Sequence, residues 1–216
     1  MSEHPAAKQL RILSTPRAAA VAGVLFALLF GTALVLIRTA LPDHPEIGTP
    51  WLDGAKTKVR IAAILMPFSG ITFLWFIGVV RDGFGRFEDK FFASVFLGSG
   101  LLFLGMTFVA SAVGVALSST HGFGADADVV AFGQTLMTTL TKTYALRMAA
   151  VFMMSLATIW LKTSLMPRWL VYTTYAASVA LLISADVSMW ITLAFPAWVL
   201  VVSLLVLNRA GVIDLD

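Results

Sequence analysis

Long apolar stretches alternate with short charged ones along the chain. Between Pro16 and Asn208 lie apolar runs that are each long enough for one membrane crossing of about 20 residues. Most of them end in Arg or Lys, as residues 18–37 do at Arg38. The runs lack the alternation of apolar and polar residues that is typical of membrane barrel strands. The pattern therefore predicts an all-α protein whose helices cross a membrane several times.

We predict a six-span transmembrane helical bundle that forms a single domain over residues 1–216. The predicted spans are residues 18–37, 61–80, 91–117, 144–161, 168–185 and 189–208. Residues 129–143 precede the fourth span without a helix-breaking residue and are amphipathic, with Val129, Phe132 and Leu136 at helical spacing. They predict an amphipathic extension of the fourth helix on the outer side. Pro67 and Pro196 predict kinks in the second and sixth spans.

Composition supports a membrane protein. The chain is 59% hydrophobic and 12% charged, with a mean hydropathy of +0.89, whereas soluble domains are about 25% charged. The first apolar run is longer than that of a signal peptide, so we expect a retained helix. The chain has no cysteine, which excludes disulfides, thiol nucleophiles and iron–sulfur clusters.

The distribution of basic residues predicts the orientation. An even number of spans places both termini on one side, and nine of the fifteen Lys and Arg residues fall on that side. The other six are Arg38, Lys56, Lys58, Arg60, Lys142 and Arg147. Cytoplasmic loops carry an excess of Lys and Arg, so we expect both termini to be cytoplasmic. The net charge of +3 is attributed to this orientation, and no nucleic-acid partner is expected.

Small residues are spaced by four along the first span. They are Ala19, Gly23, Ala27 and Gly31. Because lipid tails are as apolar as Leu, membrane helices associate where small residues let their backbones approach. This helix-packing ridge is interpreted either as a contact inside the bundle or as the seam of a homodimer.

A polar cluster at the predicted outer edge is the candidate site for an anion or a lipid headgroup. Its members are Arg38, Arg60, Lys142, Tyr144, Arg147 and Asp186. An arginine inside hydrocarbon costs at least about 2.5 kcal/mol unless it reaches the interface or finds a partner. Arg147 is the deepest, so we expect it to face the bundle and to pair with Asp186 or with backbone carbonyls. The alternative is that these side chains anchor helix ends at the headgroups.

Other chemistry finds little support in the predicted spans. None contains a histidine, Asp or Glu near its middle, which argues against a histidine-ligated haem and against a carboxylate proton relay. His44 and His121 could meet nearby acids in the outer loops, but their spacing matches no metal motif. No cofactor and no metal are expected, and no nucleophile with a base can be named.

Residues 76–106 (FIGVVRDGFGRFEDKFFASVFLGSGLLFLGM) and 195–207 (FPAWVLVVSLLVL) resemble small multi-pass bacterial membrane proteins that are uncharacterised. The resemblance implies a helical bundle in a bacterial inner membrane and carries no activity. From the residues we expect a non-enzymatic membrane component that binds lipid or a partner membrane protein. A carrier or channel for a small anionic or amphiphilic solute is the alternative, and an enzyme acting on lipid is a third possibility.

Overall fold

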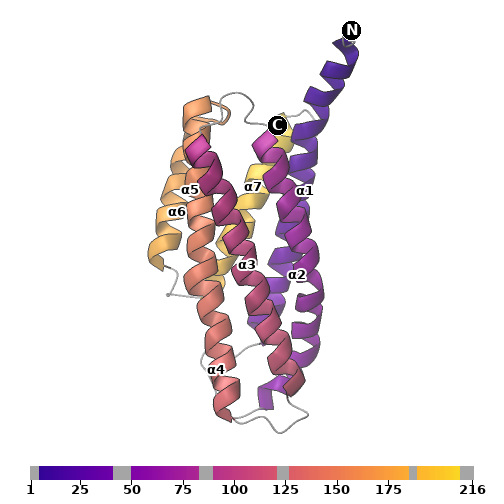
Figure 1. The fold of residues 1–216 in the computed structure, drawn as a ribbon, viewed down its shortest axis with the longest axis vertical. Helices are drawn as coiled ribbons and strands as arrows, with labels where there is room; N and C mark the ends of the chain where they lie inside the picture. Colours follow the sequence, from indigo (N-terminus) through magenta and orange to yellow (C-terminus); the bar gives the residue numbers. More distant parts are fainter. Residues whose placement is uncertain (1–4, 41–49, 83–89, 121–126, 185–188, 210–216) are drawn as a thin grey trace.

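The computed structural model describes the backbone of residues 5–40, 50–82, 90–120, 127–184 and 189–209, and the side chains of residues 17–40, 56–82, 90–119, 127–183 and 190–208. Within these ranges the chain is helical except at residues 164–167, and it contains no strand. The helices pack side by side into one elongated bundle (Figure 1). The predicted all-α helical bundle is confirmed.

In chain order the helices are α1 (Pro5–Ala40), α2 (Pro50–Asp82), α3 (Lys90–Thr120), α4 (Ala127–Thr138), the π-helix η3 (Thr139–Ala145), α5 (Leu146–Thr163), α6 (Arg168–Ser184), the 3₁₀-helix η4 (Met189–Leu193) and α7 (Ala194–Arg209). Five stretches of the described chain are long and apolar enough to cross a membrane: Arg17–Ala40, Lys56–Asp82, Lys90–Ser119, Ala127–Thr163 and Trp190–Asn208. The predicted fifth span corresponds to α6, a shorter apolar helix of 17 residues and about 25 Å.

The upper part of the bundle contains more helices than the lower part. α1, α2, α3 and the continuous helix α4–η3–α5 run along most of its length, whereas α6 and α7 lie beside the upper part only (Figure 1). α1 packs against α2 and α7, α3 packs against α2 and α5, and α6 packs on α5. η4, at the lower end of α7, contacts both α1 and η3. Six helices therefore surround the upper interior, and fewer surround the lower one.

Aromatic rings fill the upper interior. This aromatic core consists of Phe26, Phe30, Phe73, Phe76, Phe96, Phe103, Phe152, Trp160, Phe195 and Trp198, all less than a tenth exposed. Ring centroids lie 4.4 Å apart for Phe96 and Phe152, and 4.7 Å apart for Phe103 and Phe195. Because its rings come from α1, α2, α3, α5 and α7, the core joins helices that are distant in sequence.

Local sequence explains several helix ends. Pro167 precedes α6, and its carbonyl accepts hydrogen bonds from the backbone N–H groups of Leu170 and Val171. α5 ends at Thr163, and Ser164 after it has a left-handed φ of 54°, a common conformation where a helix ends. Pro196 was predicted to kink the sixth span, but it lies in the first turn of α7, after η4. A proline is tolerated there because the first N–H groups of a helix have no intrahelical partner.

Candidate functional site: a lower basic level and a hydroxyl-lined pocket

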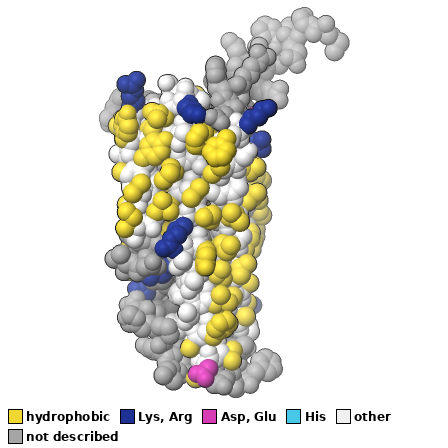
Figure 2. All heavy atoms as spheres, turned by 60° about the vertical axis from the view of Figure 1, so that its left-hand side comes forward, with side chains coloured by type: hydrophobic (Ala, Val, Ile, Leu, Met, Phe, Trp, Pro, Cys, Tyr) yellow, Lys and Arg dark blue, Asp and Glu magenta, His cyan; other side chains and the backbone are white. Residues whose placement is uncertain are grey.

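Basic side chains gather at two heights along the bundle. The upper basic level consists of Arg17, Arg81, Lys90, Lys162 and Arg168, and the lower basic level of Arg38, Lys58, Arg60, Lys142 and Arg147. Figure 2 shows basic side chains at the upper end, a second group partway down, and hydrophobic side chains between them. On α1 and on α2 the two levels are 21 positions apart, or about 31 Å of helix. This distance matches the thickness of a bilayer's hydrocarbon core, about 30 Å.

Helix direction decides where each lower cation reaches. Side chains tilt towards the N-terminus of their helix, and both α2 and the α4–α5 helix begin at the lower end (Figure 1). The tilt therefore directs Arg60, Lys142 and Arg147 towards the lower end of the bundle, away from its middle. Arg147 Nη1 donates a 2.8 Å hydrogen bond to the carbonyl oxygen of Thr143, one turn further out. A carbonyl partner for Arg147 is one of the two alternatives that the sequence predicts.

Arg38 differs because α1 runs in the opposite direction. Its side chain tilts up the bundle, towards the middle of its length. Its guanidinium carbon lies 5.5 Å from the centre of the Trp190 ring, within cation–π range. Beside it, Lys58 Nζ donates to the carbonyl oxygen of Thr39 at the end of α1, over 3.1 Å. A cation at a helix C-terminus also interacts favourably with the helix dipole.

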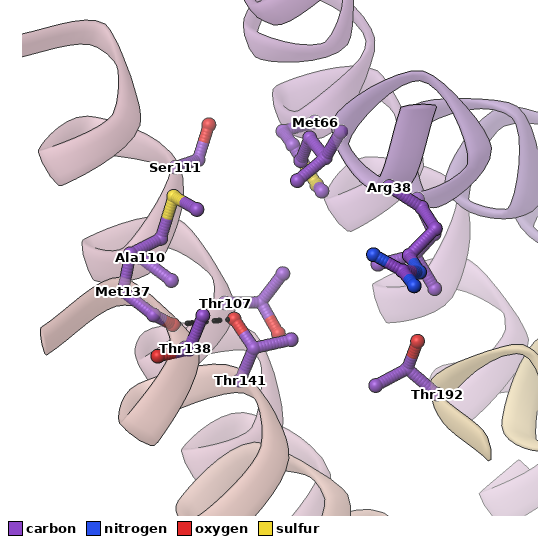
Figure 3. A pocket seen from close by; sticks show the side chains of 11 residues that line it. Arg38, Met66, Thr107, Ala110, Ser111, Met137, Thr138, Thr141 and Thr192 are labelled. Atoms are coloured by element: carbon purple, nitrogen blue, oxygen red, sulfur yellow. Dashed lines mark hydrogen bonds between the residues drawn. The ribbon is translucent and has the colours of Figure 1, made fainter. Parts of the chain in front are cut away.

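Arg38 lines a small cavity under the aromatic core, which we call the hydroxyl pocket. The surface of this pocket is mainly apolar, and Leu34, Ile37, Met66, Ala110 and Met137 contribute to it. Its polar groups come from Arg38, Thr107, Ser111, Thr138, Thr141 and Thr192, and its volume is about 30 Å³. Figure 3 shows Arg38 reaching in from one side, with Thr107, Thr138 and Thr141 on the opposite side and Thr192 below. α1, α3, α4, η3 and η4 each contribute at least one of these side chains.

Three threonines of the pocket donate their hydroxyl protons to their own helices. Thr107 Oγ1 donates to the Phe103 carbonyl over 2.8 Å, and Thr141 Oγ1 to the Met137 carbonyl over 2.9 Å. Thr138 Oγ1 lies 3.0 Å from the Gln134 carbonyl. Since a hydroxyl has one proton and two lone pairs, these groups present acceptors to the cavity. The opposite wall presents the N–H donors of Arg38.

The π-helix η3 brings both halves of the longest helix into register with the bundle. The Leu146 N–H bonds to the Thr141 carbonyl, five residues back, so this turn contains one extra residue. The buried face runs through Val130 and Met137 below the turn and through Ala149 and Met153 above it. Uninterrupted α-helical spacing would turn Tyr144 inwards, whereas Tyr144 is 53% exposed.

The described candidate residues lie at a similar level along the length of the bundle, but they do not form one cluster. α3 lies between α2, which carries Arg60, and the helix that carries Lys142 and Arg147 (Figure 1). Arg38 lines the hydroxyl pocket, and Tyr144 faces outwards. Asp186 is outside the described residues. The structure thus brings Lys142 and Arg147 onto one helix and assigns Arg38 to a different environment.

The small-residue ridge of α1 lies largely within the bundle. Ala19, Gly23 and Ala27 are buried, and Gly31 is half-buried. A Cβ atom added at Gly23 would collide with Ser203 Oγ of α7 and would lie 2.9 Å from the Phe76 ring of α2. The chain's own helices therefore cover most of this ridge. A homodimer through another surface stays a prediction.

Sequence reasoning missed the pocket threonines and the π-turn. Five threonines within residues 135–143 are ordinary for an amphipathic segment, and nothing in them indicates a partner on α1. The π-turn could have been found from the sequence. The small and apolar residues before residue 142 mark one helical face, those after it mark another, and the two faces are offset by one residue.

Within the described residues, no group of three or more His, Asp or Glu could hold a metal ion. The suggested loop site around His44 and His121 lies outside those residues. Comparison with protein-family models, curated proteins and solved structures found no match to this chain.

Proposed function

We propose that this chain is a non-enzymatic, multi-pass protein of a bacterial inner membrane that binds the anionic headgroup of a lipid on its outer side. The observation that carries the proposal is the position of Lys142 and Arg147. Both are half-buried on one helix, at the lower basic level, and Arg147 folds back over the Thr143 carbonyl. Two partly exposed cations at headgroup depth attract a phosphate.

The surface around these cations supports a lipid as the ligand. Tyr144 lies between them in sequence and is 53% exposed, and a tyrosine at this depth suits the amphipathic interface. Above them, apolar side chains face outwards and form the belt in Figure 2. A headgroup at Lys142 and Arg147 would leave its acyl chains beside this belt.

The aromatic core supports a binding role over a carrier. A carrier for an anionic solute needs a polar route to the middle of the membrane. Among the described residues, the interior between the two basic levels is filled by packed rings such as Phe73, Phe103 and Phe195. Burying an anion among them would be expensive, because no charged partner lines this part of the described interior.

Charge supports an orientation with both termini in the cytoplasm. α1 begins and α7 ends at the upper end (Figure 1), the side to which nine of the fifteen Lys and Arg residues are assigned. Because the chain has no cysteine, single cysteines report topology without background. In intact cells, a membrane-impermeant maleimide should label Ser119→Cys at the lower end and should leave Ser164→Cys at the upper end unlabelled. The reverse pattern would overturn the orientation.

Lipid binding is tested by native mass spectrometry of the purified chain with phosphatidylglycerol and phosphatidylcholine. Each cation near an anionic surface contributes about 1 kcal/mol, so Lys142→Gln with Arg147→Gln should weaken phosphatidylglycerol binding about 30-fold. The matched control is Lys162→Gln with Arg168→Gln at the upper basic level. Equal losses in the two double variants, or none in the first, would contradict the proposed site.

The predicted Arg147–Asp186 pair gives a second test of the same site. A carboxylate that pairs with Arg147 competes with a lipid phosphate for the same guanidinium. Asp186→Asn should therefore strengthen phosphatidylglycerol binding in the wild-type background, and it should change nothing in the Arg147→Gln background. Weaker binding in Asp186→Asn alone would contradict this competition.

A further inference from the structure

We propose that the hydroxyl pocket is a hydration site, in which one or two ordered water molecules bridge the Arg38 guanidinium to the threonines of α3, α4 and η3. This inference does not depend on lipid binding, because the pocket lies inside the bundle and Lys142 and Arg147 are not among its lining residues.

Size restricts what the pocket can hold. Its volume is about 30 Å³, and on the same measure a cavity needs about 10–15 Å³ for one water molecule. This space is too small to enclose a lipid headgroup or an organic solute. The remaining occupants are water and small monatomic ions.

Charge and hydrogen-bond direction select water among these. The Arg38 guanidinium in the wall repels a cation. Thr107, Thr138 and Thr141 give their protons to the Phe103, Gln134 and Met137 carbonyls, so an anion would meet oxygen lone pairs on that side. Water fits because it accepts from a guanidinium N–H and donates to hydroxyl oxygens at the same time, and buried waters make about three such bonds.

The site also explains how Arg38 is tolerated. The direction of α1 tilts the Arg38 side chain up the bundle, where it lies in the pocket wall, whereas Arg60 and Arg147 tilt towards the lower end. A guanidinium that enters the interior loses hydration, which is costly unless other groups replace it. Water held between Arg38 and the threonines restores part of this hydration, and the Trp190 ring covers another side of the same group at 5.5 Å.

Pulsed radiolytic hydroxyl labelling of the full chain in lipid nanodiscs tests the proposal. Bound water generates radicals in place, so the buried side chains that touch it are oxidised even where bulk radicals cannot reach. Met66 and Met137 line the pocket and are only 3% and 5% exposed. Met153 is 0% exposed and lies among the apolar residues of the main hydrophobic cluster, so it is the internal control.

Met66 and Met137 should be oxidised severalfold faster than Met153. Thr107→Val with Thr141→Val keeps the shape and removes two acceptors, so it should lower labelling of both methionines towards that of Met153. Thr158→Val, on α5 outside the pocket lining, should leave labelling unchanged. Equal rates for the three methionines would overturn the proposal, as would labelling that Thr107→Val with Thr141→Val does not affect. Labelling that changes when sodium or chloride is replaced would identify an ion and would also overturn it.

Discussion

The aromatic core and the hydroxyl pocket lie one or two turns apart along the same helices. Aromatic side chains fill the core, whereas the pocket is a cavity with polar groups in its wall. On α3, Phe103 belongs to the core, and Thr107, one turn lower, lines the pocket. On α1, Phe30 lies in the core and Arg38 in the pocket wall. The change coincides with the end of the α6–α7 pair, where η4 lies between α1 and η3.

The comparison shows how the number of surrounding helices determines what can fill a membrane bundle. Around the core, α1, α2, α3, α5 and α7 supply enough aromatic side chains to close the interior. At the level of η4, the lower end of the α6–α7 pair, the described residues leave a cavity of about 30 Å³. Empty cavities in a core are destabilising, whereas a cavity that offers several hydrogen-bond partners can hold water. Threonine suits this position because its hydroxyl bonds to its own helix and still accepts.

Truncating the centre of the core should have the largest effect. Phe73 is 0% exposed, and its ring centroid lies 4.6 Å from that of Phe26 and 5.3 Å from that of Phe152. Phe73→Ala should lower the free energy of unfolding by about 3–5 kcal/mol, measured by chemical or thermal unfolding in detergent. Trp75→Ala is the control, because Trp75 is 63% exposed. Similar losses for both would show that the rings are not the dry, tightly packed region described.

Closing the contact between α1 and α7 should have the next largest effect. Gly23→Ala places a methyl group against Ser203 Oγ and the Phe76 ring, and such overpacking costs about 1–3 kcal/mol. Gly31→Ala is the control, because nothing lies within 4 Å of its added Cβ atom. Alanine's better helix propensity should make Gly31→Ala stabilising by up to about 1 kcal/mol. Adding Ser203→Ala should restore part of the Gly23→Ala loss, and a lack of rescue would contradict the assigned contact.

Removing a buried polar contact beside the core should have a smaller effect. Trp198 Nε1 donates to Thr174 Oγ1 over 3.0 Å and links α7 to α6. Hydrogen bonds between membrane helices contribute about 0.6 kcal/mol on average and about 1.7 at most, so Thr174→Val should lower the free energy of unfolding by an amount in this range. Thr173→Val is the control, because Thr173 bonds only to carbonyls of its own helix. A double-mutant cycle with Trp198→Phe isolates the pair.

The same contrast separates what the sequence can predict from what it cannot. Runs bounded by Arg17, Arg38 and Arg81 predict the long helices, because hydrocarbon imposes a minimum length and tolerates few charges. The pocket is not predictable in this way, since Arg38, Thr107, Thr141 and Thr192 come from four elements. Their proximity depends on where the α6–α7 pair ends. The direction in which Arg38 tilts along the bundle is predictable, because it follows from the direction of α1, and the order of the spans gives that direction.

The smallest expected effect concerns the π-turn, and it tests the register argument directly. Since η3 contains one residue more than an α-helical turn, deleting Tyr144, which is 53% exposed, should convert the turn to α-helix. Val130 and Met153 would keep facing the bundle, so the free energy of unfolding should change by less than about 1 kcal/mol.

Deleting Val151 instead, within regular α5, rotates the buried faces on its two sides by about 100° relative to each other and should prevent folding. Cysteine cross-linking between α3 and α5 reports whether the register is kept. If the Tyr144 deletion unfolds the protein as the Val151 deletion does, then η3 is not an inserted residue, and the buried faces of α4 and α5 must be matched by some other means.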